Sequence, residues 1–220
     1  MKVFVSHSKR DIELVNSIFK VLHRANLKPF IAEFEELGEI GKFTAAELRK
    51  EILESKMLIL LLTKNVVASP YTRNWVAYEV GVAHGSGIPI WVFEDENNPV
   101  SKFPIPHVDY YFLYDPKLNR DWGKIEQVLK EQGALKPIDA AVIGGLIGTI
   151  LGGPSAGIIL GLLGAAVTSK PPEDKQSPFI KIENFQCPKC RSKYTIIGKK
   201  STLTREFLCP VCRTGLSLQL

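Results

Sequence analysis

Residues 57–85 read MLILLLTKNVVASPYTRNWVAYEVGVAHG and decide the fold. The first six, MLILLL, form an uninterrupted apolar run, which is typical of a strand buried on both faces of a parallel sheet. Ser69 and Pro70 then predict the start of a helix, because serine caps helices and proline fits the first helical turn. A buried strand followed by a helix is the repeating unit of an α/β fold.

The rest of the N-terminal half repeats this unit. Short apolar runs predict strands, and 3.6-residue periodicity or a capping box predicts helices. The predicted strands are Lys2–Ser6, Leu27–Ile31, Met57–Leu62, Ile88–Phe93 and Val108–Leu113. The predicted helices are Asp11–Arg24, a helix capped by Thr44, a helix that contains Trp75 and Glu79, and Trp122–Gln132. This alternation predicts a flavodoxin-like, open, parallel five-stranded sheet of order 2-1-3-4-5. Ligands of such sheets bind beyond the carboxyl ends of the strands.

Glu79 is the candidate functional residue of the helix that follows MLILLL. It is the only formal charge between Asn74 and Phe93, and its helix neighbours are mostly apolar. A carboxylate in such surroundings is costly to desolvate, which favours a functional role over an incidental one. Trp75 lies one turn away on the same helix face. The alternative is a buried glutamate that pairs with an arginine or a backbone amide.

Charge divides the chain into three parts. Residues 1–136 carry 18 Lys+Arg and 18 Asp+Glu, whereas residues 170–220 carry 10 Lys+Arg against 4 Asp+Glu, hence +6. The basic residues of the C-terminal part could bind nucleic acid or an anionic membrane surface. The alternative is that they form a solvated charged surface. The basic residues near the cysteines are Lys189, Arg191, Lys193, Lys199, Lys200, Arg205 and Arg213.

Residues 140–169 contain no charged side chain. As a continuous helix they would reach about 45 Å at about 1.5 Å per residue, more than the roughly 30 Å hydrocarbon core of a bilayer. Glycines recur every four residues on either side of Pro154, a small-xxx-small pattern that lets helices approach closely. Residues 138–169 are therefore predicted to be a glycine zipper that enters the membrane as a kinked span or a hairpin. A core buried by soluble self-assembly is the alternative.

Two Cys-x2-Cys pairs close the chain and predict a metal site. Cys187, Cys190, Cys209 and Cys212 supply four thiolates at the spacing of a structural Zn²⁺ site with no open position. The predicted organisation is thus an α/β domain over 1–133, the apolar segment over 138–169, a linker over 170–181 and a small zinc-ribbon β domain over 182–220.

The first domain resembles the TIR (Toll/interleukin-1 receptor) family. The resemblance rests on VFVSHSKRD at residues 3–11 and on the spacing of Trp75 and Glu79, and it covers residues 1–115, more loosely to 133. The family usually has cysteine after the tryptophan, where this chain has Val76. Residues 33–43 match the position of the family's variable interaction loop and are unusually acidic.

The resemblance implies one of two functions. Some TIR domains are enzymes that cleave NAD⁺ between nicotinamide and ribose, and in them the glutamate that matches Glu79 is essential. Others are adaptors that only bind partners. For an enzyme, Ser6, His7 and Ser8 are candidates to line the phosphates or the base, and Trp75 either packs or stacks. The chain has no glycine fingerprint of a dinucleotide cofactor, which fits NAD⁺ as a consumed substrate.

These features together predict a defence protein of microbial type. NAD⁺ cleavage by Glu79 would be activated by self-association through the TIR domain and the glycine zipper, with the protein on a membrane and the TIR domain facing the cytoplasm. The alternative is a non-catalytic TIR adaptor or sensor whose glycine zipper permeabilises the membrane.

Overall fold

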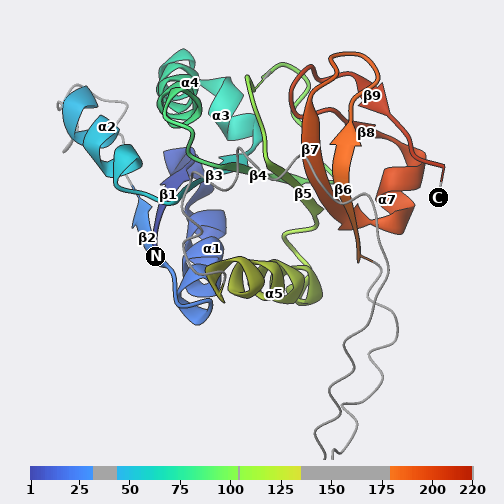
Figure 1. Ribbon diagram of the computed structural model, residues 1–220, viewed down its shortest axis with the longest axis horizontal. Coiled ribbons are helices and arrows are strands. Elements are labelled where there is room, and N and C mark those ends of the chain that lie inside the picture. Colours follow the sequence, from blue (N-terminus) through green and yellow to red (C-terminus); the bar gives the residue numbers. More distant parts are fainter. Residues whose placement is uncertain (32–43, 104, 135–178, 220) are drawn as a thin grey trace, which may run out of the picture. The chain divides into compact units, whose positions relative to one another are not determined.

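The computed structural model describes residues 1–31, 44–103, 105–134 and 179–219. Their central feature is a mostly parallel sheet (Figure 1). Its strands are β1 (Lys2–Ser6), β2 (Lys28–Ile31), β3 (Met57–Leu62), β4 (Ile90–Asp95), β5 (Tyr110–Tyr114), β6 (Phe179–Gln186) and β7 (Lys193–Lys199). The order β2-β1-β3-β4-β5-β7-β6 contains the predicted 2-1-3-4-5 arrangement, which is therefore confirmed.

Helices cover both faces of the sheet (Figure 1). One face carries α1 (Ile12–Arg24) and α5 (Asn119–Ala134); the other carries α2 (Ala45–Leu53), α3 (Lys64–Ala68) and α4 (Pro70–Gly85). The capping signals act as predicted, since Thr44 and Glu47 form a capping box at α2 and Ser69 accepts a hydrogen bond at the start of α4. The chain thus forms the α/β fold that alternating strands and helices predict.

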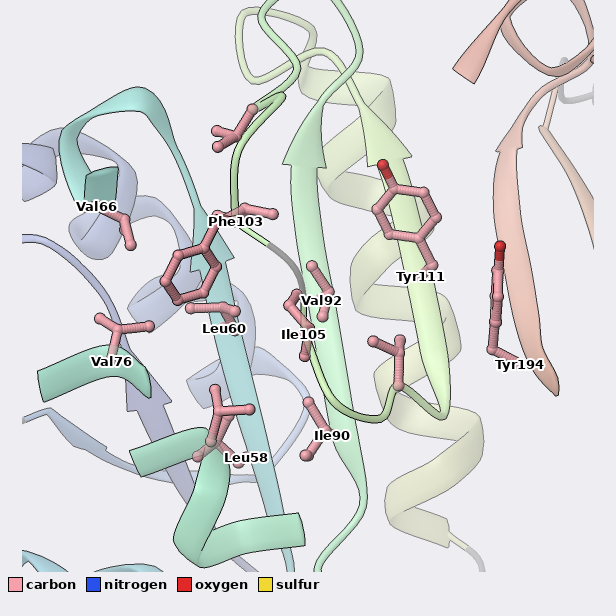
Figure 2. Close-up of a cluster of buried hydrophobic side chains, with 14 of the residues drawn as sticks. Leu58, Leu60, Val66, Val76, Ile90, Val92, Phe103, Ile105, Tyr111 and Tyr194 are labelled. Atoms are coloured by element: carbon pink, nitrogen blue, oxygen red, sulfur yellow. The ribbon is translucent and has the colours of Figure 1, made fainter. Parts of the chain in front are cut away.

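The prediction of five strands was wrong, because two C-terminal strands extend the sheet. β7 pairs parallel to β5, and β6 pairs antiparallel to β7. At Gly198, an added Cβ would come within 3.2 Å of the Leu113 Cβ, so glycine lets β7 lie close to β5. Figure 2 shows Tyr111 of β5 and Tyr194 of β7 in the same buried layer as Leu60 and Phe103. The apolar core therefore continues into the cysteine-bearing segment.

The remaining elements follow β7. They are α7 (Lys200–Arg205) and a two-stranded ribbon of β8 (Phe207–Leu208) and β9 (Gly215–Leu216). Residues Met1–Gly133 and Pro178–Leu220 belong to one compact unit, in which β6 and β7 join the main sheet whereas β8 and β9 pair with each other. The division of the chain into segments 1–133, 138–169, 170–181 and 182–220 stays a prediction.

The predicted glycine zipper, residues 138–169, and most of the predicted linker lie outside the described residues. Among the helices that the structure describes, none combines the length and the apolar character needed to cross a bilayer. Membrane attachment therefore stays a prediction from the sequence.

Candidate functional site

Glu79 lies where helix α4 passes the carboxyl end of β1. Phe4 of β1 packs in the core on the α4 side, and Ser6, two residues further along the strand, points to the same side. The Ser6 hydroxyl donates a hydrogen bond to Glu79 Oε2 over 2.5 Å. The Glu79 side chain is only 2% exposed, and Val76, Val80 and Ala83 of the same helix are buried around it. The predicted apolar surroundings of this carboxyl group are confirmed.

Burial controls the charge of Glu79. It raises the pKa of the carboxyl group from 4.5 to about 8, and the hydrogen bond from Ser6 opposes the shift. No lysine or arginine among the described residues forms an ion pair with Glu79. The alternative of a glutamate locked to an arginine is therefore absent from this part of the chain. The carboxyl group is mostly protonated at pH 7 and ionises at mildly alkaline pH.

The other predicted site residues lie nearby but have local roles. His7 is buried, with Nδ1 3.2 Å from the Val5 carbonyl oxygen. Ser8 accepts a hydrogen bond from the Arg10 amide and caps a short 3₁₀ turn, η1 (Lys9–Asp11). Of the three serine and histidine candidates, Ser6 is the one that the structure joins to Glu79. The substrate-binding role of all three stays a prediction.

Trp75 lies in an aromatic row along α4. Its ring meets the edges of Tyr71 and Tyr78, with centroids 6.3 Å and 5.8 Å away. The indole is half-buried and also packs against the core on this side of the sheet. The structure thus gives Trp75 a packing role, and it leaves the predicted stacking role untested.

Glu79 lines neither of two well-formed cavities among the described residues. The larger, about 590 Å³, lies at the carboxyl ends of the strands on the side of α1 and α5. The smaller, about 240 Å³, lies between α4 and the loop after β4, and Arg73 and Phe103 contribute to it. Residues 32–43, which follow β2, lie outside the described residues.

The four cysteines converge on one point. Their sulfurs all lie within 4.8 Å of one another, and the Sγ atoms of Cys187 and Cys212, like those of Cys190 and Cys209, are 3.8 Å apart. A tetrahedral Zn²⁺ with bonds of about 2.3 Å would separate its sulfurs by about 3.8 Å. The donor set and its spacing therefore fit a four-thiolate Zn²⁺ centre, which would stabilise the fold and leave no position for substrate.

Each Cys-x2-Cys pair forms the same tight turn. The Arg191 amide donates to the Cys187 carbonyl, and the Arg213 amide donates to the Cys209 carbonyl, both over 2.9 Å. Both arginines have positive φ angles, 62° and 55°. The two turns are thus local copies of each other, and each presents an arginine directly after its second cysteine.

Comparison with protein-family models matches residues 3–129 to the TIR domain, more than half of the chain. The chain belongs to the TIR-domain family. Among solved structures, it is similar to the TIR domains of the activated Roq1 resistosome directly recognizing the pathogen effector XopQ. The identity is 16% over 61% of this chain and 84% of that one, with a TM-score of 0.37. No curated protein matches the chain.

The C-terminal residues outside the matched range are tied to the TIR sheet by buried charges. Arg213 Nη2 donates to Glu94 Oε1 over 2.6 Å, and Glu94 also accepts hydrogen bonds from the Tyr111 hydroxyl and the Val100 amide. Lys199 forms ion pairs with Glu96 and with Asp121, the latter over 2.8 Å. The TIR domain and the cysteine-bearing segment therefore share three buried ion pairs.

Sequence reasoning missed these contacts. Glu94 and Glu96 belong to an EDE run directly after an apolar strand, which resembles a solvated loop. Two of the basic residues proposed for nucleic acid, Lys199 and Arg213, have side chains only 8% and 4% exposed. They neutralise buried carboxylates, so they are not part of a basic surface. No local pattern separates Arg213 from Arg191, which holds the equivalent position in the first cysteine turn but is exposed.

Proposed function

We propose that this TIR domain cleaves NAD⁺ between nicotinamide and ribose, with Glu79 as the catalytic residue. The observation that carries the proposal is a carboxyl group buried beside the end of β1, held by the Ser6 hydroxyl and paired with no cation among the described residues. Because no cation is bound to it, such a carboxyl group is available to a substrate once it ionises. The resemblance to NAD⁺-cleaving TIR domains, whose essential glutamate matches Glu79, supports the proposal.

The chemistry needs one well-placed carboxylate. When the glycosidic bond breaks, its electron pair leaves with neutral nicotinamide, and positive charge develops on the ribose carbon and ring oxygen. A carboxylate in a poorly solvated site can accept hydrogen bonds from the ribose hydroxyls and stabilise that positive charge. Water then adds to the ribose carbon and releases a proton. Ser6 would position the Glu79 carboxylate throughout.

The pKa of about 8 makes the ionisation of Glu79 part of the mechanism. In the free protein the carboxyl group is mostly neutral at pH 7, and only the carboxylate can stabilise the ribose cation. Hydroxyl donors and the positive nicotinamide ring of bound NAD⁺ both favour the carboxylate. The kcat/KM for NAD⁺ should therefore rise about tenfold per pH unit up to about pH 8 and then level off, because this parameter reports the free enzyme.

Nicotinamide release by the full chain tests the proposal. Wild type, Glu79→Gln and Glu131→Gln are compared at high protein concentration across this pH range. Glu131 is exposed on α5 and serves as the matched control. We expect Glu79→Gln to lose at least about 100-fold in rate and the control to keep its activity and pH profile. Equal rates for wild type and Glu79→Gln would refute the assignment.

A second candidate function is a TIR adaptor without catalysis. It is favoured by the 2% exposure of Glu79. In that case Glu79 would serve packing alone. Wild type and Glu79→Gln would both be inactive toward NAD⁺, and both would bind the same protein partners.

A further inference from the structure

The larger cavity lies on the opposite side of the sheet from Glu79. Ser6 and Glu79 belong to the side covered by α4, whereas the cavity is walled by the start of α1, the start of α5 and the last residues of β4 and β5. It lies at the carboxyl ends of β1 and β3, between which the strand order reverses. Doubly wound sheets bind small molecules at that point. A volume of about 590 Å³ is in the range of small-molecule sites, about 300–1,000 Å³.

Tyr114 forms part of the inner wall of this cavity. Tyr114 is 1% exposed, and its hydroxyl group has no hydrogen-bond partner among the described residues. Burial and the nearby charges of Asp95 and Asp11 raise the pKa of Tyr114, so its hydroxyl stays protonated and can donate. A ligand oxygen in the cavity can accept a hydrogen bond from this hydroxyl.

Two carboxylates stand beside Tyr114. Asp11 accepts hydrogen bonds from Thr63 Oγ1 and Asn65 Nδ2, each over 2.5 Å, which fixes its orientation. In the turn that follows β4, Asp95 accepts hydrogen bonds from the Asn97 backbone amide and from Asn98 Nδ2. Each carboxylate oxygen can accept a second hydrogen bond. Together they can receive the hydroxyl groups of a sugar, as a carboxylate does in dinucleotide-binding sheets.

Cations surround the same cavity. Lys64 follows β3, Lys117 follows β5, and Arg10 precedes α1; all three line the cavity. The Lys64 ammonium group lies 3.3 Å from Asn98 Oδ1, in the turn that holds Asp95. Ammonium groups of this kind bind phosphate as point charges. The cavity thus offers acceptors and a donor for hydroxyl groups together with positive charge for a phosphate.

We propose that this cavity binds a phosphorylated sugar, with the sugar hydroxyls on Asp95 and Tyr114 and the phosphate on Lys64 and Lys117. The site is separate from Glu79 and does not depend on NAD⁺ cleavage. A sugar phosphate fits better than a simple anion, because a bare phosphate would meet the negative charges of Asp11 and Asp95 without hydroxyl groups to offset them.

Four related probes dissect the ligand. Ribose 5-phosphate carries both chemical features; ribose lacks the phosphate, 2-deoxyribose 5-phosphate lacks one hydroxyl, and inorganic phosphate lacks the sugar. Titration calorimetry of the full chain should give saturable binding of ribose 5-phosphate. Each truncated probe should bind about tenfold or more weakly, since one lost polar contact costs about 1–3 kcal/mol. The absence of saturable binding of ribose 5-phosphate at millimolar concentration would overturn the proposal.

Variants locate the binding. Tyr114→Phe keeps the ring and should weaken ribose 5-phosphate binding about 3- to 10-fold, as one hydrogen bond predicts. Lys117→Ala should weaken the phosphorylated probes and leave ribose unchanged. Lys102→Ala, which alters the smaller cavity, is the matched control. Unchanged binding by Tyr114→Phe and Lys117→Ala, or loss of binding in Glu79→Gln, would show that the ligand sits elsewhere.

Discussion

The guanidinium of Arg213 lies 2.6 Å from the carboxylate of Glu94, and both side chains are almost completely buried, 4% and 0% exposed. Arg213 directly follows Cys212, the last of the four clustered cysteines, whereas Glu94 belongs to β4 in the middle of the TIR sheet. The turn that carries Cys209 and Cys212 therefore also supplies the counter-charge of a carboxylate inside the TIR domain. Stability of the two parts is coupled through this pair.

The two arginines after the cysteine turns form a matched pair of test sites. Arg213→Ala leaves Glu94 as an uncompensated buried charge, which should lower the free energy of unfolding by roughly 3–5 kcal/mol. Arg191 has the same backbone conformation but is exposed, so Arg191→Ala should cost less than about 1 kcal/mol. Urea unfolding of both variants measures the difference. Equal costs would show that the Glu94 pair contributes nothing specific.

A double variant separates charge from packing at this pair. Nε and Nη1 of Arg213 are buried without hydrogen-bond partners among the described residues, so the pair is incompletely satisfied. Such pairs are often replaced by apolar groups at little cost. Arg213→Met combined with Glu94→Gln should therefore recover most of the stability that Arg213→Ala loses. A double variant as unstable as Arg213→Ala would indicate that the packing of the Arg213 side chain, and not its charge, stabilises the fold.

Removal of the metal should destabilise the whole described unit. The thiolate centre holds Arg213, and the strand β7 between the two cysteine pairs is hydrogen-bonded to β5. Trp91 and Trp122 are buried in the TIR domain on the α1 and α5 side and report its packing. A chelator should lower the thermal midpoint of their near-ultraviolet signal by several degrees, as lost binding free energy predicts. A tryptophan signal that does not respond would mean that the centre stabilises the C-terminal segment alone.

Truncation after residue 135 should destroy the TIR domain. Without β7, the edge of β5 is left unpaired, and Glu94 loses Arg213. An unpaired apolar edge strand promotes aggregation. The fragment should elute as aggregate in size-exclusion chromatography, and Glu94→Gln in the same fragment should recover part of the monomer because it removes the unpaired charge. A monomeric, cooperatively folded wild-type fragment would contradict the coupling of the two parts.

Local sequence patterns predicted the fold well and its long-range pairing poorly. MLILLL and the Ser69-Pro70 start signal act within a few residues, so strand β3 and helix α4 were correct. The pairing of β7 with β5 depends on residues far apart in the chain, such as Leu113 and Gly198, and no local period encodes it. Glu79 stood out because a charge in an apolar helix is conspicuous, whereas Glu94 was hidden in an acidic run.

The last prediction concerns the pH dependence of stability at Glu79. Its folded pKa of about 8 exceeds the unfolded value of 4.5, so between these values the folded protein binds the extra proton. The stability contribution is therefore fully present below about pH 4.5 and is lost as pH rises toward 8, with a slope of up to about 1.4 kcal/mol per pH unit. Above pH 8 the loss should reach a few kcal/mol.

Glu79→Gln removes this titration and keeps the shape of the side chain. Its free energy of unfolding, relative to wild type, should therefore rise between pH 5 and pH 8 and become constant above that range. Ser6→Ala should shift the same transition to higher pH, because the Ser6 hydroxyl favours the carboxylate. Glu131→Gln, on the surface, should follow wild type. Parallel stability profiles for Glu79→Gln and wild type would mean that this carboxyl group is already ionised at neutral pH, with a solvated environment that the buried geometry does not provide.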